Sequence, residues 1–415
     1  MDNKRSRQKV GLINEIKNYS DKKSLSTDKR SALDNFLENG FPTINDEEWR
    51  YTSLKKTISG QYSVNAIGRD VTKKEIENHS LGLKHKIVFV DGFLISKPEI
   101  KNISISAYSE FNTNASEPLE KLNYSLAKKG YTISVNANTT IQEPIEILFF
   151  NTVENNFIQY RNIISVGNNS QVKFIEKIQN IDCDNVFVNS FTHIKCESNS
   201  KLEFNKIQNN TPKSSLVDTV NVLQKKDSVS NINTLIFGGK FIRNNLNFEQ
   251  NGTNAESNMN GISVLSKNQL ADNHTFVDHK SPNCSSNEMY KGIYLEQSKG
   301  VFNGKIMVRE DSQKIDAFQS NNTLLLSEDA TINSKPQLEI YADDVKCSHG
   351  CTIGQLDKEA LFYMRSRGIG KEEAQAILTY AFASEAINNI TINKVAMLAK
   401  QLLIHKLDVD LDHNI

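Results

Sequence analysis

Two thiols and an imidazole lie within five residues near the C-terminal end of the chain, at Cys347, His349 and Cys351. On a β-strand, side chains alternate between the two faces, so these residues share one face with Val345 and Ile353. On a helix, Cys347 and Cys351 would align while His349 pointed away. A strand is therefore the conformation that gathers the three soft ligands. The apolar ends of this face predict that it is buried in the core or under a partner.

The spacing of these residues limits the metal chemistry that one chain could perform. A flat strand places Cys347 and Cys351 roughly 13 Å apart, too far for a disulfide, which needs Cα atoms within about 7 Å. One metal ion with bonds of about 2.0–2.3 Å cannot easily collect all three side chains. Cys347 and His349 could share an ion whose other ligands come from elsewhere, including another chain. The alternative is that the cysteines are small buried hydrophobic residues and the histidine an ordinary core residue.

The composition excludes several classes of partner. Lys+Arg and Asp+Glu both number 49, so the formal net charge is zero. This balance argues against nucleic acid or an anionic membrane surface as the main partner. No run of about 18 apolar residues occurs, which predicts no membrane span, and the basic N-terminus lacks the apolar stretch of a secretory signal. We therefore expect a cytoplasmic protein whose five cysteines are reduced.

The hydrophobic periodicity divides the chain into three regions. Residues 1–85 are predicted as an N-terminal helical region, with a polar tether over 55–85 and a packing role for Trp49, the only tryptophan. Residues 86–355 are predicted as a β core, in which short strands recur roughly every 10–16 residues between turns rich in Asn, Gly, Ser and Asp. Residues 356–415 are predicted as a C-terminal helical region, which could cap the end of the core or offer a docking surface.

This pattern predicts a mainly β fold with a parallel β-helix as its core. Almost no amphipathic helices lie between the strands, which argues against a doubly wound α/β sheet. The strand candidates number about sixteen or more and exceed the seven to nine of an ordinary sandwich. Long series of short strands are typical of solenoids, although no clean repeat is visible. A double sandwich is the alternative architecture.

The motifs of several enzyme classes are absent from the sequence. There is no phosphate-binding loop, so the chain is not expected to hydrolyse nucleotide itself. No Gly-x-Ser-x-Gly elbow and no His-Glu-x-x-His helix occurs. A second concentration of polar ligands at His274, Asp278, His279 and Cys284 could bind a metal, but solvated turn residues are the more ordinary interpretation.

Two groups of motifs carry a resemblance to a known family. The first is EEWRYTSL at residues 47–54, preceded by Pro42 and Thr43. The second is KPQLEIYADDVKCSHG at 335–350, continued by TIGQLD and LFYMRSRGI up to residue 369. Both resemble the SufB/SufD proteins of iron–sulfur cluster assembly, and the second resembles the SufD branch in particular. Because the motifs lie near opposite ends, the resemblance covers essentially the whole chain.

The resemblance implies a right-handed parallel β-helix between helical terminal regions, acting as a non-enzymatic scaffold subunit. It implies a SufB-like sister subunit as partner, with a homodimer as the alternative for the isolated chain, and an ABC-type ATPase, SufC, bound chiefly through the C-terminal helices. It also implies that His349 lies at the SufB interface and helps a SufB cysteine to assemble a transient iron–sulfur cluster. No cofactor would be held permanently by this chain alone. Cys347 belongs to the same motif, whereas Cys351 replaces a common Ala, either as a buried substitute or as a third ligand.

The segment after the motif supplies the candidates for a hinge or for docking the ATPase, which are Leu361, Phe362, Tyr363, Arg365 and Arg367. Capping of the solenoid is the alternative role for its aromatic residues. Two other protein classes remain. A polysaccharide-cleaving β-helix enzyme would favour a secretory signal and a groove of clustered carboxylates or Arg. A homomeric zinc-binding structural protein would hold stoichiometric zinc at Cys347 and His349.

Overall fold

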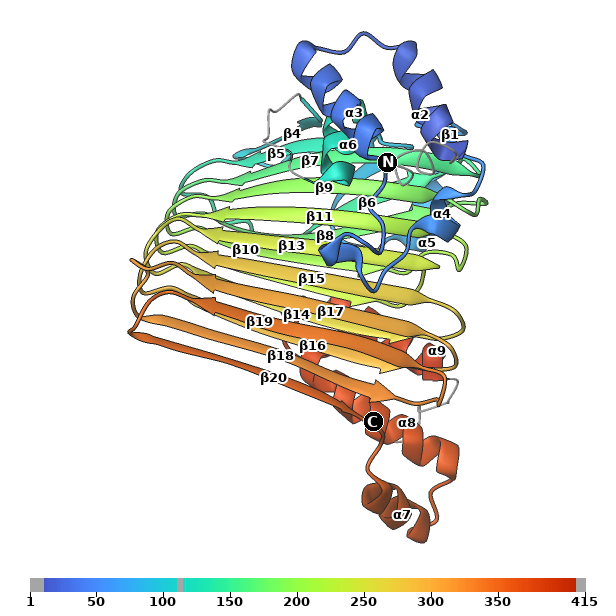
Figure 1. Ribbon diagram of the computed structural model, residues 1–415, viewed down its shortest axis with the longest axis vertical. Helices are drawn as coiled ribbons and strands as arrows, with labels where there is room; N and C mark the ends of the chain where they lie inside the picture. The colour runs from blue at the N-terminus through green and yellow to red at the C-terminus, as the bar shows by residue number, and fades with distance from the viewer. Residues whose placement is uncertain (1–10, 110–114, 116, 408–415) are drawn as a thin grey trace.

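A parallel β-solenoid with helices at both ends makes up the computed structural model, which describes residues 11–109, 115 and 117–407 (Figure 1). From β5 onward the chain passes from one sheet to the other after each strand. Sheet A comprises β1 (Ser63–Val64), β4 (Ile103–Ala107), β5 (Tyr131–Val135), β7 (Asn156–Val166), β9 (Phe187–Cys196), β11 (Ser215–Gln224), β13 (Phe241–Gln250), β15 (Leu270–His279), β17 (Lys299–Val308) and β19 (Thr331–Ile340). Sheet B comprises β2 (His85–Val90), β3 (Phe93–Ser96), β6 (Ile145–Asn151), β8 (Gln171–Asn180), β10 (Lys201–Gln208), β12 (Val229–Ile236), β14 (Glu256–Leu265), β16 (Ser285–Tyr294), β18 (Ile315–Leu325) and β20 (Val345–Gly354).

The register between coils confirms the parallel β-helix and explains why no repeat is visible in the sequence. Phe157, Phe187, Ser215 and Phe241 stand in one row of sheet A, at successive steps of 30, 28 and 26 residues. The coils therefore differ in length while their strands stay aligned. A fixed sequence period cannot arise from such a chain, and the double sandwich is excluded.

Asparagine side chains stabilise a corner between the coils. Asn138, Asn169 and Asn199 all have a positive φ, between 55° and 57°, a conformation that Asn tolerates better than most residues. Asn169 Nδ2 donates to Asn138 Oδ1 at 2.8 Å, and Asn199 Nδ2 donates to Asn169 Oδ1 at 2.9 Å. Part of the frequent use of Asn in this sequence is therefore structural.

The interior of the solenoid is a packed core rather than a channel. Inward side chains of both sheets form one apolar cluster, in which the Phe149 ring stacks between Phe89 and Tyr160 at centroid distances of 4.7 and 4.6 Å. Such packing supplies the main stabilisation of each coil on the next.

Most of the N-terminal helices pack on the outer face of sheet A, but the one at Lys73–His79 packs on sheet B, where Ile76 contacts the cluster of Val88 and Phe150. The helices are α2 (Gly11–Asp21), α3 (Thr27–Asn39), the 3-10 helix η2 (Glu47–Trp49), α4 (Lys55–Ile58), α5 (Lys73–His79) and α6 (Pro118–Leu126). Leu12 and Phe36 meet Phe157 and Phe187 of the sheet in one buried cluster. Gly40 ends α3 with a φ of 72° and an N–H bonded to Phe36 O.

The prediction of a polar tether over residues 55–85 is wrong, because this stretch contains α4, β1 and α5. These elements are too short to show a hydrophobic period. They are held instead by local contacts: Ile58 is buried, and α5 begins with a capping box between Thr72 and Glu75.

The C-terminal helices are α7 (Lys358–Ser366), α8 (Lys371–Ile387) and α9 (Asn393–Leu407). Helices α8 and α9 cover the outer face of sheet B, where Ile387 and Leu403 pack against Leu235 and Ile262. They therefore cover a side of the solenoid, and the alternative in which these helices cap its end is wrong for α8 and α9. Helix α7 projects beyond β20 at the bottom of Figure 1. No helix in the described residues is both long and apolar enough to cross a membrane.

Candidate functional site

The Cys-x-His-x-Cys face lies on β20, the last strand of the solenoid. This strand pairs in parallel with β18, and within the described chain no strand pairs with its other edge. The predicted strand conformation is therefore confirmed. His349 and Cys351 are exposed and Cys347 is half-buried, so the core of this chain does not bury the ligand face.

The three soft ligands have different surroundings. Cys347 packs against Ala317 and its neighbours at the end of the core, and desolvation by this burial, with the charge of Asp316, raises the pKa of its thiol. Cys351 is open to solvent and its Sγ donates to Ser334 Oγ of β19 at 3.2 Å. The more accessible thiol of the motif is thus Cys351, not Cys347.

The metal chemistry of this chain is limited by its geometry. Across residues 11–109, 115 and 117–407, no three or more His, Cys, Asp or Glu side chains are grouped so that they could hold a metal ion. A site with three or more ligands around His349 would therefore need side chains from outside this part of the chain. The described residues provide no zinc-binding arrangement that supports the structural zinc alternative.

Exposed apolar side chains surround the ligand face. Phe318, Ile340, Tyr341 and Ile353 are 43%, 40%, 61% and 50% exposed, and all lie on or next to the last strands of the two sheets. Phe318, in register with Ser348, points to the outer face of sheet B, whereas Ile353 shares the face of His349. We call Ile340, Tyr341, Ile353 and His349 the terminal surface. Apolar groups gathered at an unpaired sheet edge are typical of an interaction site.

The second group of ligand types in the sequence is dispersed in the structure. His279 lies inside the solenoid with Nε2 3.0 Å from Ser286 Oγ, and desolvation by burial lowers its pKa to about 4. Asp278, the next residue along the strand, faces outward and pairs with Arg309. Cys284 is buried in a different cluster. The possible metal site at these residues is therefore not formed, because strand alternation separates them.

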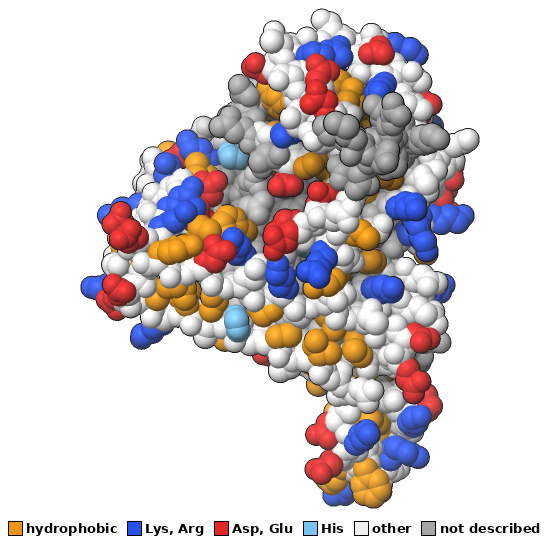
Figure 2. Space-filling view, in the orientation of Figure 1, with side chains coloured by type: hydrophobic (Ala, Val, Ile, Leu, Met, Phe, Trp, Pro, Cys, Tyr) orange, Lys and Arg blue, Asp and Glu red, His pale blue; other side chains and the backbone are white. Residues whose placement is uncertain are grey.

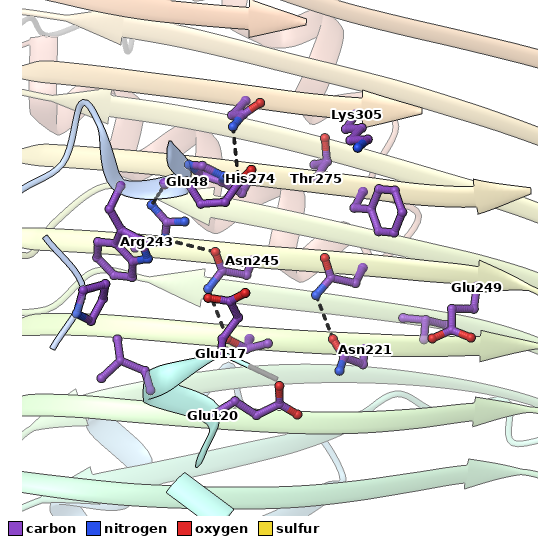
Figure 3. A pocket seen from close by; sticks show the side chains of 18 of the residues that line it. Glu48, Glu117, Glu120, Asn221, Arg243, Asn245, Glu249, His274, Thr275 and Lys305 are labelled. Carbon is purple, nitrogen blue, oxygen red and sulfur yellow. Dashed lines mark hydrogen bonds and ion pairs between the residues drawn. The ribbon is translucent and has the colours of Figure 1, made fainter. Parts of the chain in front are cut away.

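A groove of about 710 Å³ lies on the outer face of sheet A, between the N-terminal segment and the start of α6 (Figure 3). Trp49 anchors this segment: its ring lies 3.9 Å from the Arg243 guanidinium, and only 5% of the residue is exposed. The packing role predicted for Trp49 is confirmed.

A buried charge network fastens the 48–52 segment to the sheet. Arg243 Nη1 donates to Asp272 Oδ2 at 2.7 Å and to Glu48 O at 2.8 Å. Thr52 Oγ1 donates to Asp272 Oδ2 at 2.6 Å, and His274 lies between the Asp272 and Glu48 carboxylates at 2.9 and 3.2 Å. Sequence reasoning missed Arg243 and Asp272. They are 29 residues apart and in register on neighbouring coils. The length of this coil would have to be known before the sequence could predict that the two residues are neighbours.

The candidate docking residues all lie on α7 or at its C-terminal end. Asp357 caps the helix by accepting from the Glu359 and Ala360 N–H groups, as its position in the sequence predicts. No residue of α7 is buried, and Phe362 and Tyr363 are 75% and 59% exposed. These aromatic rings therefore do not cap the solenoid, and the alternative that assigned them that role is wrong.

The same part of the helix is basic as well as aromatic. Arg365 is exposed, as is Arg367, whose guanidinium lies 5.4 Å from the Tyr363 ring and donates to its hydroxyl at 3.2 Å. Leu361 is half-buried. Figure 2 shows apolar and charged side chains together on this projecting part of the molecule.

Comparison with known proteins identifies the family. Residues 149–382 match the sequence model of the SUF system FeS cluster assembly, SufBD core domain. The iron–sulfur cluster assembly protein SufD of Escherichia coli is 30% identical over 87% of this chain and 88% of its own length. A SufBD family protein of Synechocystis is 29% identical over 89% and 88%, and the chloroplastic protein ABCI7 of Arabidopsis thaliana is 26% identical over 86% and 81%. The chain therefore belongs to the SufB/SufD family of iron–sulfur cluster assembly proteins and is of the SufD type.

Proposed function

We propose that this chain is a non-enzymatic scaffold subunit of a SufBCD-type complex, which pairs with a SufB-like subunit and holds a nascent iron–sulfur cluster between the two. The observation that carries the proposal is the terminal surface, where an unpaired strand presents His349 among exposed apolar side chains. The five free thiols suit a reducing compartment, and we place the complex in the cytoplasm.

The terminal surface suits a second solenoid as its partner. The open edge of β20 offers backbone donors and acceptors that a neighbouring strand can pair with. Ile340, Tyr341 and Ile353 would lose their contact with water in such an interface. A SufB-like subunit has a related solenoid, and the same surface would let the isolated chain form a homodimer.

His349 would be the ligand that this chain contributes to the cluster. The cluster is the product that the complex assembles and is not a permanent cofactor. A neutral imidazole is a competent iron ligand, whereas most ligands of iron–sulfur clusters are thiolates. The sister subunit would supply a thiolate ligand. Cys347 is the second candidate ligand, and Cys351 is the third.

Replacing His349 by Ala is expected to lower the cluster content of the complex at least about ten-fold, since changes to the partners of a ligand alone cost 10–100-fold in metal affinity. The complex would be purified through a tag on this chain after co-expression with SufB-like and SufC-like partners, and iron and sulfide measured per complex. His405→Ala is the matched control, because His405 is an exposed histidine on α9. Wild-type cluster content in a recovered His349→Ala complex would remove His349 from the chemistry.

We also propose that α7 docks the SufC-like ATPase. The helix displays Phe362, Tyr363, Arg365 and Arg367 without packing them against the solenoid. Aromatic and Arg side chains are the types that dominate binding energy at protein interfaces. Three residues separate α7 from β20, so the docking helix and the cluster strand are adjacent in the chain.

The double variant Phe362→Ala/Tyr363→Ala is expected to weaken ATPase binding by about 30-fold, the effect of losing one interface hot spot of about 2 kcal/mol. Its unfolding temperature should stay that of the wild type, because both rings are exposed. Met397→Ala on α9, at 59% exposure, is the control for loss of an exposed apolar side chain. Equal ATPase affinities for the double variant and the wild type, measured by titration, would exclude this docking site.

A further inference from the structure

One inward-facing row of sheet B changes from apolar to polar as it approaches His349. The residues of the row are in register on successive strands from β8 to β20, and they are Phe174, Phe204, Ile232, Met259, Glu288, Gln319 and His349. The first six are fully or almost fully buried. Buried polar groups in a packed core are costly unless their hydrogen bonds are satisfied, so this change of polarity at the last coils requires a reason.

The orientation of the Gln319 amide is set by its surroundings. Its Nε2 donates to Glu288 Oε2 at 3.1 Å, and the same oxygen accepts from Thr275 Oγ1 at 2.5 Å. Gly304 faces the amide across the interior, and a Cβ at this position would come within 2.0 Å of Nε2. When Glu288 is ionised, its carboxylate can only accept from Nε2, so the two ends of the amide are not interchangeable in that state.

The other end of this amide lacks a partner. Gln319 Oε1 is buried and accepts no hydrogen bond from any described residue. Gln319 stands between Glu288 on one neighbouring strand and His349 on the other, in register with both. Neighbouring strands are about 4.8 Å apart, within the reach of a Gln side chain. A neutral imidazole has one N–H donor and one unprotonated nitrogen, which is the complement of a single buried acceptor.

We propose that Gln319 is a positioning residue for His349: its Oε1 accepts the N–H of one imidazole nitrogen and leaves the other nitrogen unprotonated for the incoming iron. This inference rests on the proposed role of His349 as a cluster ligand. Histidines that bind metals commonly donate their second ring nitrogen in this way, which fixes both the tautomer and the ring orientation. Glu288 and Thr275 act one step further back, by holding the amide with its oxygen toward the ligand.

The test measures which ring nitrogen of His349 carries the proton. Nitrogen NMR is recorded on the full chain, labelled with ¹⁵N-histidine and free of iron, at a pH where imidazoles are neutral. The His349→Ala variant assigns the signal. The tautomer ratio is expected to differ by about five-fold or more from that of an exposed, unpartnered histidine, the added bias that a single neutral hydrogen bond gives. Gln319→Met, which keeps the length of the side chain but lacks the amide acceptor, is expected to remove this bias.

Asn321→Leu is the matched control, because it removes another buried amide of β18, in register with Cys351 rather than His349. It should leave the tautomer ratio unchanged. Averaged tautomers in the wild type, or a bias that survives Gln319→Met, would overturn the inference. If Gln319→Met does not fold, Gln319→Glu, which keeps only acceptors when ionised, should keep the bias and Gln319→Leu should remove it. A strong bias that disappears in Gln319→Met, with normal cluster content in the His349→Ala complex, would instead refute the proposed function and leave the hydrogen bond.

Discussion

Replacing Asp272 by Asn is expected to lower the free energy of unfolding by about 3–5 kcal/mol, the usual cost of breaking a buried ion pair from one side. Asp272 is fully buried and the Arg243 side chain is 3% exposed, so the variant leaves a cation in the core without its counter-charge. Thr52 also loses the charged acceptor of its hydrogen bond. The loss should be felt first in the 48–52 segment, which this network fastens to sheet A.

Urea unfolding followed by two signals measures this effect. Fluorescence of Trp49, the only tryptophan, reports the 48–52 segment, and circular dichroism reports the strands of the solenoid. The fluorescence transition should move to lower urea by more than the dichroism transition. Glu249→Gln is the control, because its carboxylate pairs with Lys280 at the surface and such pairs contribute about 0–1 kcal/mol. Equal effects of the two substitutions would show that the buried network does not hold the N-terminal segment.

The same network makes the free energy of unfolding depend on pH in the acid range. Burial alone raises the pKa of Asp272, but attraction to Arg243 and His274 and hydrogen bonds from His274 and Thr52 lower the pKa from 3.8 to about 2. A lowered pKa stabilises the fold above the unfolded pKa, so this contribution of about 2 kcal/mol is present above pH ~4 and lost as the pH falls toward ~2. The Asn variant should lack this part of the acid dependence.

Replacing Glu288 by Gln is expected to raise the free energy of unfolding by about 3 kcal/mol above neutral pH. Desolvation by burial raises the pKa of Glu288 from 4.5 to about 7, against the lowering effect of hydrogen bonds from Thr275 and Gln319. The folded protein therefore binds a proton more tightly than the unfolded chain. The contribution of Glu288 to stability therefore falls as the pH rises from about 4.5 to 7, and its penalty is complete above that range. Gln keeps an acceptor for both neighbours and removes the charge.

Urea unfolding at a series of pH values between about 4 and 8 checks this prediction. His279, whose pKa is lowered to about 4, makes both proteins more stable as the pH rises, so the effect of Glu288 is read from the difference between them. The two should be about equally stable at the acid end, and Glu288→Gln should become the more stable one as the pH rises. Glu256→Gln, on the neighbouring strand and exposed, is the control and should follow the wild type. A variant less stable than the wild type at pH ~8 would show that the Glu288 carboxylate has an unrecognised buried partner.

Much of the candidate site was predictable from local sequence. The strand conformation of Cys347, His349 and Cys351 followed from alternation, and the need for outside ligands followed from the length of an extended chain. The exposure of His349 and Cys351 did not follow. Val345 and Ile353 predict a covered face, but whether the cover is the core or a partner depends on β20 being the last strand of its sheet. The residues of a strand do not by themselves determine whether it lies at the edge or in the middle of a sheet.

The sequence by itself determined the class of the fold, the strands, the caps of α7 and the family, because strand alternation, capping chemistry and motifs are local along the chain. Only the tertiary structure decided which residues meet across coils. Asp272 joins Arg243 and Gln319 stands behind His349 because one coil brings residues about 30 positions apart into register, and the coils vary in length. It also decided that α8 and α9 cover the side of sheet B while α7 stays exposed. Partner choice between apolar surfaces depends on their complementary shapes, which no periodicity in the sequence records.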